Sequence, residues 1–134
     1  MSRTYRERYD KHYKLFKTKG GCYYCGLPEE VLDHAPPLAA IRDLGGPDEL
    51  VKLGLKLLKV AACKECNAIL HDVPIASLAR RKLFVQEKMR KKYKKLLTMP
   101  KWTEQELQEL SPQLRETVRR SLIARVVIQL RLIH

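Results

Sequence analysis

The chain has 134 residues, of which 45% are apolar and 31% are charged, and it carries a net charge of +12. This length favours one domain, and the composition is typical of a folded protein rather than a disordered one. No apolar run approaches the roughly 18 residues of a membrane span, and the charged N-terminus lacks the apolar centre of a secretory signal. We therefore expect an intracellular, cytoplasmic protein with reduced thiols and no membrane partner.

The positive charge is concentrated in separate parts of the chain. Residues 80–95 carry nine Lys or Arg against Glu87 alone, and residues 1–19 carry seven against two acids. Residues 20–79, which hold all four cysteines, have a small negative net charge instead. Basic segments that bracket such a middle suit a site that approaches a polyanion, although basic surfaces can also serve solubility alone. We predict that the chain binds nucleic acid.

The first third of the chain predicts one helix followed by a turn and a strand. Four aromatic residues recur there at helical spacing: Tyr5, Tyr9, Tyr13 and Phe16. They predict an amphipathic helix over residues 3–17 whose aromatic face belongs to the core, and the glycine pair at 20–21 ends it. The sequence CYYCG at 22–26 predicts a tight turn, and VLDH at 31–34 predicts a short strand. Residues 36–40 are expected to be irregular.

The middle of the chain predicts a helix, a strand and a second, shorter helix. Residues 45–59 are expected to be helical, with Pro47 near the first position and two acids in the first turn. The segment KVAAC at 59–63 could instead be a strand that leads to the second cysteine pair. After Cys66, NAILHD predicts a short helix that breaks near Pro74.

The last part of the chain predicts three helices. Residues 75–97 are expected to form a long basic helix with one apolar face, a capping box at 103–106 starts a short acidic helix, and Ser111 starts the last helix. The apolar end of that helix is expected to pack on this domain or on a second subunit, as in a homodimer. We expect a core over residues 1–74 and a basic helical extension over residues 75–134. Nine basic residues of the long helix are the predicted nucleic-acid contacts: Arg80, Arg81, Lys82, Lys88, Arg90, Lys91, Lys92, Lys94 and Lys95.

All cysteines of the chain lie in two Cys-x-x-Cys pairs: Cys22, Cys25, Cys63 and Cys66. Two such pairs in a reduced compartment fit a tetrahedral Zn²⁺ held by four thiolates. The 37 residues between the pairs exceed the usual spacing, so something substantial is inserted there. A disulfide or a redox dithiol is the rival interpretation, but the surrounding sequence does not resemble a thioredoxin-type unit. With four protein ligands this zinc would have no open position, and its role would be structural.

Asp33 and His34 end the predicted strand, and Asn67 directly follows the last cysteine. If zinc holds Asn67 close to the end of that strand, the Asp33 and Asn67 oxygens face one another beside a histidine. Hard ions such as Mg²⁺ take oxygen ligands, and phosphodiester hydrolysis requires neutralised phosphate charge and a base for the attacking water. Each residue also has an ordinary role available: Asp33 in a turn, His34 on the surface and Asn67 as a helix cap.

Taken together, Cys22-x-x-Cys25, Asp33–His34 before prolines, and Cys63-x-x-Cys66–Asn67 resemble the HNH, or ββα-metal (His-Me finger), endonucleases. The chain is most similar to the zinc-containing recombination endonuclease VII group, over roughly residues 10–75. The resemblance implies a small zinc-stapled ββα-metal core. The helical C-terminal extension lies outside it, and together with the N-terminal helix it makes the expected fold α+β and mainly helical. The resemblance also implies a DNA endonuclease of a bacterial or phage-infected cell, with His34 as general base and Asp33 and Asn67 as ligands of a catalytic Mg²⁺ or Mn²⁺.

The chain departs from that pattern at Leu58 and after the second cysteine pair, where NAILHD stands in place of the lysine or glycine that the family often has. Many family members have an Asn that orients the base about five residues before the second cysteine pair, where this chain has Leu58. His71 lies four residues after Asn67 on the same helix face, where it could be a third ligand of the catalytic metal or could cap the helix end. His12 and His134 are expected to be surface residues. The rival functions are a non-catalytic zinc-containing nucleic-acid-binding protein, such as a regulator or packaging accessory, and a scaffold with a decayed nuclease fold.

Overall fold

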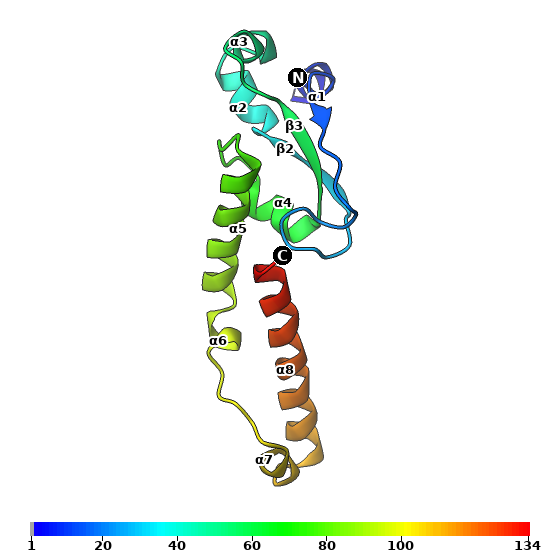
Figure 1. Cartoon of the computed structure of the whole chain (residues 1–134), viewed down its shortest axis with the longest axis vertical. Helices are drawn as coiled ribbons and strands as arrows, with labels where there is room; N and C mark the ends of the chain where they lie inside the picture. The colour runs from blue at the N-terminus through cyan, green and yellow to red at the C-terminus, as the bar shows by residue number, and fades with distance from the viewer. Residues whose placement is uncertain (1) are drawn as a thin grey trace.

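The computed structural model describes the backbone of residues 2–134 and the side chains from Tyr5 onward (Figure 1). A small three-stranded sheet lies towards one end of an elongated molecule, and helices make up most of the rest. The predicted α+β class, mainly helical, is confirmed at this level. Within the described residues, no helix combines the length and apolar character that a membrane span requires.

The sheet consists of β1 (Lys14–Leu15), β2 (Val31–Ala35) and β3 (Leu58–Ala62), in the spatial order β1-β3-β2. β2 runs antiparallel to β3, and their register places Asp33 opposite Val60 and His34 opposite Lys59. Because successive side chains of a strand point to opposite faces, Asp33 and His34 face different sides of the sheet. Asp33 is buried, whereas His34 is half-buried. The strands that the sequence predicted at VLDH and KVAAC are both present.

The N-terminal helix is shorter than the periodicity predicted. α1 spans Ser2–Asp10, and the chain then pairs with β3 through hydrogen bonds from Lys14 N to Leu57 O and from Phe16 N to Lys59 O. Pairing with the open edge of β3 satisfies backbone groups that a longer helix would have satisfied internally, so tertiary structure overrides the aromatic spacing here. Tyr5 and Tyr13 are buried as predicted, but Phe16 is exposed.

The insertion between β2 and β3 contains two short helices, α2 (Leu38–Asp43) and α3 (Pro47–Lys52). The expectation of irregular chain at 36–40 is therefore wrong from Leu38 onward, and the single helix predicted over 45–59 is too long. Gly54, with a φ of +82°, follows Leu53, the C-cap of α3, and turns the chain towards β3. With α1, these helices build a small core of their own, made by Tyr5, Tyr13, Leu38, Ile41, Leu50 and Leu57.

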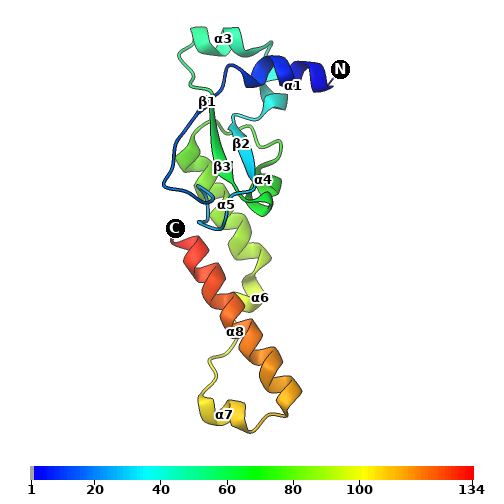
Figure 2. The same ribbon diagram turned by 90° about the vertical axis from the view of Figure 1, so that its right-hand side faces the viewer.

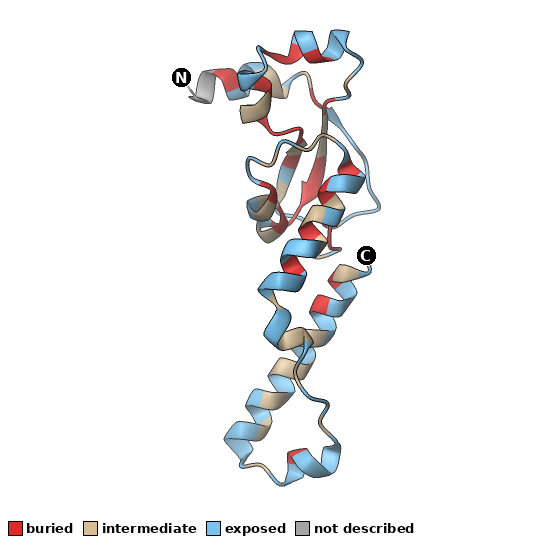
Figure 3. Ribbon diagram, turned by 90° about the vertical axis from the view of Figure 1, so that its left-hand side faces the viewer, coloured by how far each residue is buried: buried red, intermediate tan, exposed pale blue. Residues whose placement is uncertain are grey.

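The larger core surrounds the four cysteines. α4 (Lys64–Leu70) follows β3 directly, and α5 (Leu78–Lys92) packs on α4 through Leu78, Val85 and Met89. A short α6 (Lys94–Leu97) continues α5, so the predicted long helix is present with one interruption. The first helix of the predicted extension thus shares a core with the cysteines, and Figure 3 shows buried positions recurring along it.

The C-terminal helix brings the chain back to the cysteine-containing turn. α7 (Glu104–Gln108) has the predicted capping box, and α8 (Pro112–Leu132) begins after Ser111 as expected. α8 runs back alongside α6 and the end of α5 (Figure 2), and His134 meets the backbone of Gly26. Ile128 and Arg131 are buried, whereas several large apolar residues of the same helix stay exposed: Ile123, Val126, Leu130 and Ile133.

Candidate active site and metal centre

The four cysteine sulfurs converge at one buried point. The Sγ atoms of Cys22, Cys25, Cys63 and Cys66 all lie within 4.8 Å of one another, and Cys25 Sγ and Cys63 Sγ are 3.7 Å apart. A tetrahedral ion with Zn–S bonds of about 2.3 Å spaces its sulfurs about 3.8 Å apart. All four cysteines are free rather than disulfide-bonded. The four-cysteine cluster can therefore hold a structural metal ion such as zinc.

Two local structures aim the sulfurs inward. The first pair sits in a tight turn in which Gly26 N donates to Cys22 O, and Tyr23 N fastens this turn to Ala61 O of β3. Gly26 has a φ of +82° and meets the His134 ring, so a side chain there would be strained and would clash. In the second pair, Cys63 is the N-cap of α4, and its Sγ accepts from Cys66 N at 3.4 Å.

The thiols oppose one another's ionisation unless a cation is present. Hydrogen bonding to Cys25 raises the pKa of the Cys22 thiol to about 11, whereas hydrogen bonding to Cys22 lowers the pKa of Cys25. Only a fraction of the cluster can thus ionise by itself, because neighbouring negative charges repel. A divalent ion removes this conflict, and its binding releases protons. The donor set therefore fits a metal better than four free thiols.

A polar group from α8 lies against the cluster. Arg131 is 4% exposed, and its Nη2 lies 3.9 Å from Cys63 Sγ and 2.6 Å from Glu65 Oε1. Glu65 also accepts from Lys92 and Tyr93 of α5 and its continuation. Burial opposes the ionisation of Glu65, but these hydrogen bonds outweigh it and lower its pKa to about 2. The cluster, α4, α5 and α8 are thus joined by one set of charged groups.

A pocket of about 310 Å³ lies beside β2 and gathers most of the residues that the sequence singled out. Its polar lining comes from three distant parts of the chain: Arg6, Asp33, His34, Asn67, His71 and Asp72. β2 contributes its free edge, because only its other edge pairs with β3. The end of α4 supplies Asn67 and the residues that follow it. The expectation that Asn67 approaches the Asp33–His34 strand agrees with this arrangement.

Two residues, Asp10 and Tyr13, hold the His34 ring. Its Nε2 lies 2.6 Å from Asp10 Oδ1, at the end of α1. The Tyr13 ring meets the imidazole edge-on, with centroids 4.7 Å apart, and the Tyr13 hydroxyl donates to Pro36 O at 2.5 Å. The ring therefore has one preferred orientation while 19% of its side chain stays accessible.

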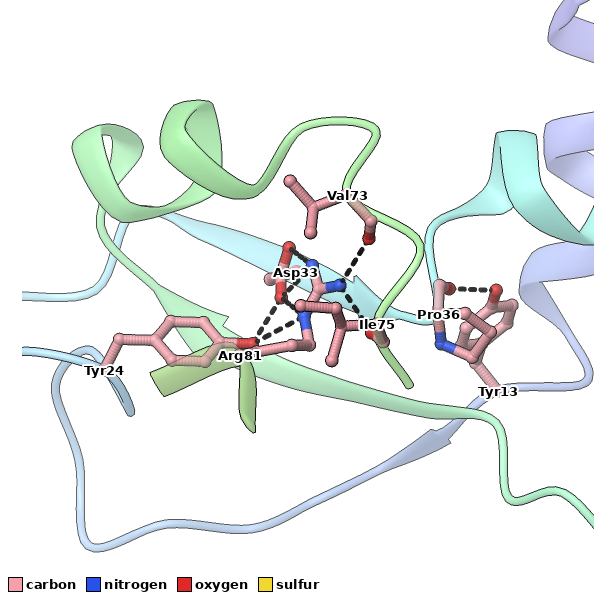
Figure 4. Close-up of polar contacts among 7 residues, drawn as sticks. All are labelled: Tyr13, Tyr24, Asp33, Pro36, Val73, Ile75 and Arg81. Carbon is pink, nitrogen blue, oxygen red and sulfur yellow. Dashed lines mark hydrogen bonds and ion pairs between the residues drawn. The ribbon is translucent and has the colours of Figure 1, made fainter. Parts of the chain in front are cut away.

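Asp33 is engaged in a different network, shown in Figure 4. Arg81 donates from Nη2 to Asp33 Oδ1 at 3.0 Å and from Nε to Asp33 Oδ2 at 3.1 Å, and Tyr24 donates to Oδ2 at 2.5 Å. Arg81 Nη1 donates to Val73 O and Ile75 O. Arg81 is 0% exposed and Asp33 is 2% exposed. Burial and the Asp33 charge both raise the pKa of Tyr24, so this hydroxyl stays a donor.

Asp33 does not fit the part of a catalytic metal ligand in this arrangement. Both of its oxygens accept hydrogen bonds from a buried guanidinium, whose positive charge would repel a divalent cation a few ångströms away. Asn67 is half-buried at the pocket wall, and His71 is exposed, with its Nε2 3.5 Å from Asp72 Oδ2. The pocket thus brings His34, Asn67 and His71 together, but it leaves Asp33 paired with Arg81.

The predicted nucleic-acid contacts divide between surface and core. Seven of the nine residues are exposed and Lys82 is half-buried. The assignment of Arg81 to a nucleic-acid surface is wrong, because its side chain is fully buried and all its donors point inward. Lys91 pairs with Glu87, and Lys92 pairs with Glu65. Among the described residues, Arg80, Lys88, Arg90, Lys94 and Lys95 are exposed and form no ion pair, so these five remain the best-placed basic residues.

Sequence reasoning missed Asp10, Arg6 and Arg131. Arg6 lines the pocket and Asp10 contacts His34, and nothing in their local sequence indicates either placement. Arg131 lies within the apolar end of the last helix, where an isolated charged residue on an otherwise apolar segment could have suggested a buried partner.

No known protein family matches the chain, and neither a curated protein nor a solved structure matches it.

Proposed function

We propose that this protein is a DNA endonuclease that hydrolyses phosphodiester bonds in the pocket beside His34. The observation that carries the proposal is the pocket itself, which collects His34, Asn67 and His71 from separate parts of the chain. A half-buried histidine with one accessible side, in a polar cleft, is the usual setting of a general base. The basic segments at residues 1–19 and 80–95 supply the attraction for a polyanion.

The chemistry assigned to the pocket is the addition of water across a P–O bond. His34 takes a proton from water as the water oxygen bonds to phosphorus, and the bond from phosphorus to the leaving oxygen breaks. The leaving oxygen takes a proton from solvent, and His34 later returns its own proton to solvent. Arg6, on the pocket wall, is suited to pair with the non-bridging phosphate oxygens.

The order of elements supports the same proposal. β2, β3 and α4 form an antiparallel pair followed by a helix, with His34 on the first strand and a cysteine at the start of the helix. This is the order expected from the resemblance to ββα-metal endonucleases, with zinc as a structural ion. Dependence on Mg²⁺ or Mn²⁺ is part of the proposal, but we assign no ligand role to Asp33 and derive no step through such an ion.

We predict that His34→Ala abolishes nicking of supercoiled plasmid in Mg²⁺ or Mn²⁺, with a loss of at least about 100-fold in rate. General-base catalysis contributes roughly 10²- to 10⁴-fold, and alanine offers no proton acceptor. The nicked fraction is followed on agarose gels, with EDTA in a parallel reaction to measure the cation requirement. His12→Ala is the matched control, because His12 lies outside the pocket, and it should cut like the wild type.

Equal cutting by the His34→Ala protein would contradict this assignment. A linear product at early times would indicate cutting of both strands and therefore a homodimer, since one site cuts one strand per visit.

A zinc-containing nucleic-acid-binding protein without catalysis is the second candidate. The observation that favours it is the Asp33–Arg81 pair, which occupies the carboxylate that the resemblance assigns to a catalytic metal. Under this alternative the wild-type protein would bind plasmid tightly and leave it uncut in every cation. The nicking assay therefore separates the two functions directly.

The basic face of α5 and α6 is proposed to lie along the phosphate backbone. Replacing Arg90, Lys94 and Lys95 with Gln should weaken DNA binding and reduce the slope of log K against log salt by up to about 0.9 for each lost phosphate contact. Fluorescence anisotropy at several salt concentrations measures this slope. The control replaces Lys52, Lys56 and Lys101, which removes the same charge elsewhere. An unchanged slope in the first variant would assign this face to solvent.

A further inference from the structure

Asp10, the last residue of α1, places its carboxylate directly on the His34 ring. Asp10 Oδ1 lies 2.6 Å from His34 Nε2, although the two residues are 24 positions apart in sequence. An ionised carboxylate can only accept hydrogen bonds, so His34 Nε2 must carry the hydrogen. In the neutral imidazole the other ring nitrogen, Nδ1, then has the free lone pair.

The sheet register keeps this carboxylate in place. His34 and Lys59 are direct cross-strand partners, so both side chains emerge on the same face of the sheet. Lys59 Nζ lies 3.2 Å from Asp10 Oδ2, while Oδ1 faces the imidazole. Hydrogen bonding to His34, opposed by desolvation and assisted by Lys59, lowers the pKa of Asp10. Asp10 is therefore ionised and fixed between its two partners.

We infer that Asp10 is the positioning residue of the His34 base, and that it holds the imidazole as the Nε2–H tautomer with Nδ1 left to accept a proton. The inference rests on the proposed nuclease function and extends the site to α1. Asp10 touches neither water nor phosphate in this role, and it acts only through the ring of His34. The hydrogen bond to Asp10 fixes the tautomer of the His34 ring, and packing against Tyr13 fixes its rotation. Without these contacts, a smaller fraction of the rings would be in the reactive form.

An ordinary surface ion pair is the competing explanation. The Asp10 side chain is 44% exposed, and exposed pairs contribute little to folding stability. Such a pair would contribute nothing to catalysis, and its loss would leave the rate of cutting unchanged. The two explanations therefore differ in what they predict when Asp10 is replaced. The positioning role predicts a small effect on folding stability and a large effect on the rate of cutting.

The experiment compares wild type, Asp10→Ala, Asp10→Asn and the control Asp43→Asn, which removes one negative charge from an exposed side chain of α2. Plasmid nicking gives kcat and KM for each protein. Long-range ¹H–¹⁵N spectra of the ¹⁵N-labelled full chain give the tautomer of His34, assigned by its absence in His34→Ala. This spectroscopic readout does not depend on activity.

The expected result is an Nε2–H tautomer of His34 in wild type that is lost or mixed in Asp10→Ala. The same variant should show kcat lowered about 10- to 100-fold, a share of the general-base contribution, with KM changed less than about twofold. Asp10→Asn keeps an acceptor oxygen, so it should retain the tautomer and recover part of kcat. Asp43→Asn should match wild type.

Three results would contradict parts of this scheme in distinguishable ways. An Nδ1–H tautomer in the wild-type protein would overturn the inference whether or not the protein cuts DNA. If the wild-type protein cuts DNA and Asp10→Ala and Asp10→Asn cut it equally fast, the inference is overturned but the proposed function stands. A wild-type protein that cuts nothing would overturn the proposed function and, with it, the catalytic role of Asp10, even if the tautomer is as expected.

Discussion

We expect the Cys63→Ser protein to lose its bound metal and to be largely unfolded around β3 and α4 at room temperature. The cysteines are the centre of the larger core, and structural zinc supplies roughly 10–16 kcal/mol to small zinc-dependent folds. This is as large as the whole stability of a typical domain, about 5–15 kcal/mol. Metal analysis of the purified protein and circular dichroism melting measure the two effects. A chelator added to wild type should reproduce them.

The matched control for this variant is Ala68→Ser, which introduces the same residue on the exposed side of α4. It should bind metal normally and melt within a few degrees of wild type, since isolated surface substitutions change stability little. A Cys63→Ser protein that retains its metal and its melting temperature would contradict the structural metal centre.

The second large effect is expected at the buried Asp33–Arg81 pair. Asp33→Asn and Arg81→Met should each lower the free energy of unfolding by about 3–5 kcal/mol, because each leaves a buried charge without its partner. The double variant should be more stable than either single variant, since it leaves no uncompensated charge. Urea unfolding followed by tryptophan fluorescence or circular dichroism measures these differences. Arg80→Met, at the neighbouring exposed position, should change stability by less than about 0.5 kcal/mol.

This measurement also decides what Asp33 does. A buried carboxylate whose role is to bind a catalytic metal lowers the stability of the metal-free protein. Replacing it would therefore leave the free energy of unfolding unchanged or raise it. Unchanged unfolding of the Asp33→Asn protein would therefore restore Asp33 as a ligand candidate. A marked loss of stability in protein without added Mg²⁺ or Mn²⁺ would fix its role as a structural partner of Arg81.

The metal centre and the strand–strand–helix order were predictable because they depend on local spacing. Each Cys-x-x-Cys pair forms its own turn or helix start, and β2 and β3 are short apolar runs that end on buried residues. The assignment of Arg81 failed although a signal existed. Leu78, Arg81, Val85 and Met89 follow one another at helical spacing of three or four residues, which places Arg81 on the apolar face of α5.

Asp10 could not have been found in the same way. Its meeting with His34 depends on where α1 ends, and α1 ends early because the next residues pair with β3. Leu58, where the resemblance expects an orienting Asn, has no polar group to offer, so the sequence alone left His34 without support. The contact that supplies it joins residues 24 positions apart and leaves no local pattern.

The two cysteine pairs also determine how well the protein tolerates changes in the length of the chain between them. Cys25 and Cys63 are 38 positions apart, so an ion bound by both pairs closes a loop that contains α2 and α3. The entropy of closing a flexible loop grows only with the logarithm of its length, about 0.6 kcal/mol for each doubling. Insertions or deletions between β2 and β3 would therefore change the cost of closing this loop little. The same changes would alter the smaller core that α2 and α3 form with α1. The surroundings of His34 can therefore diverge during evolution while the cysteine core stays constant.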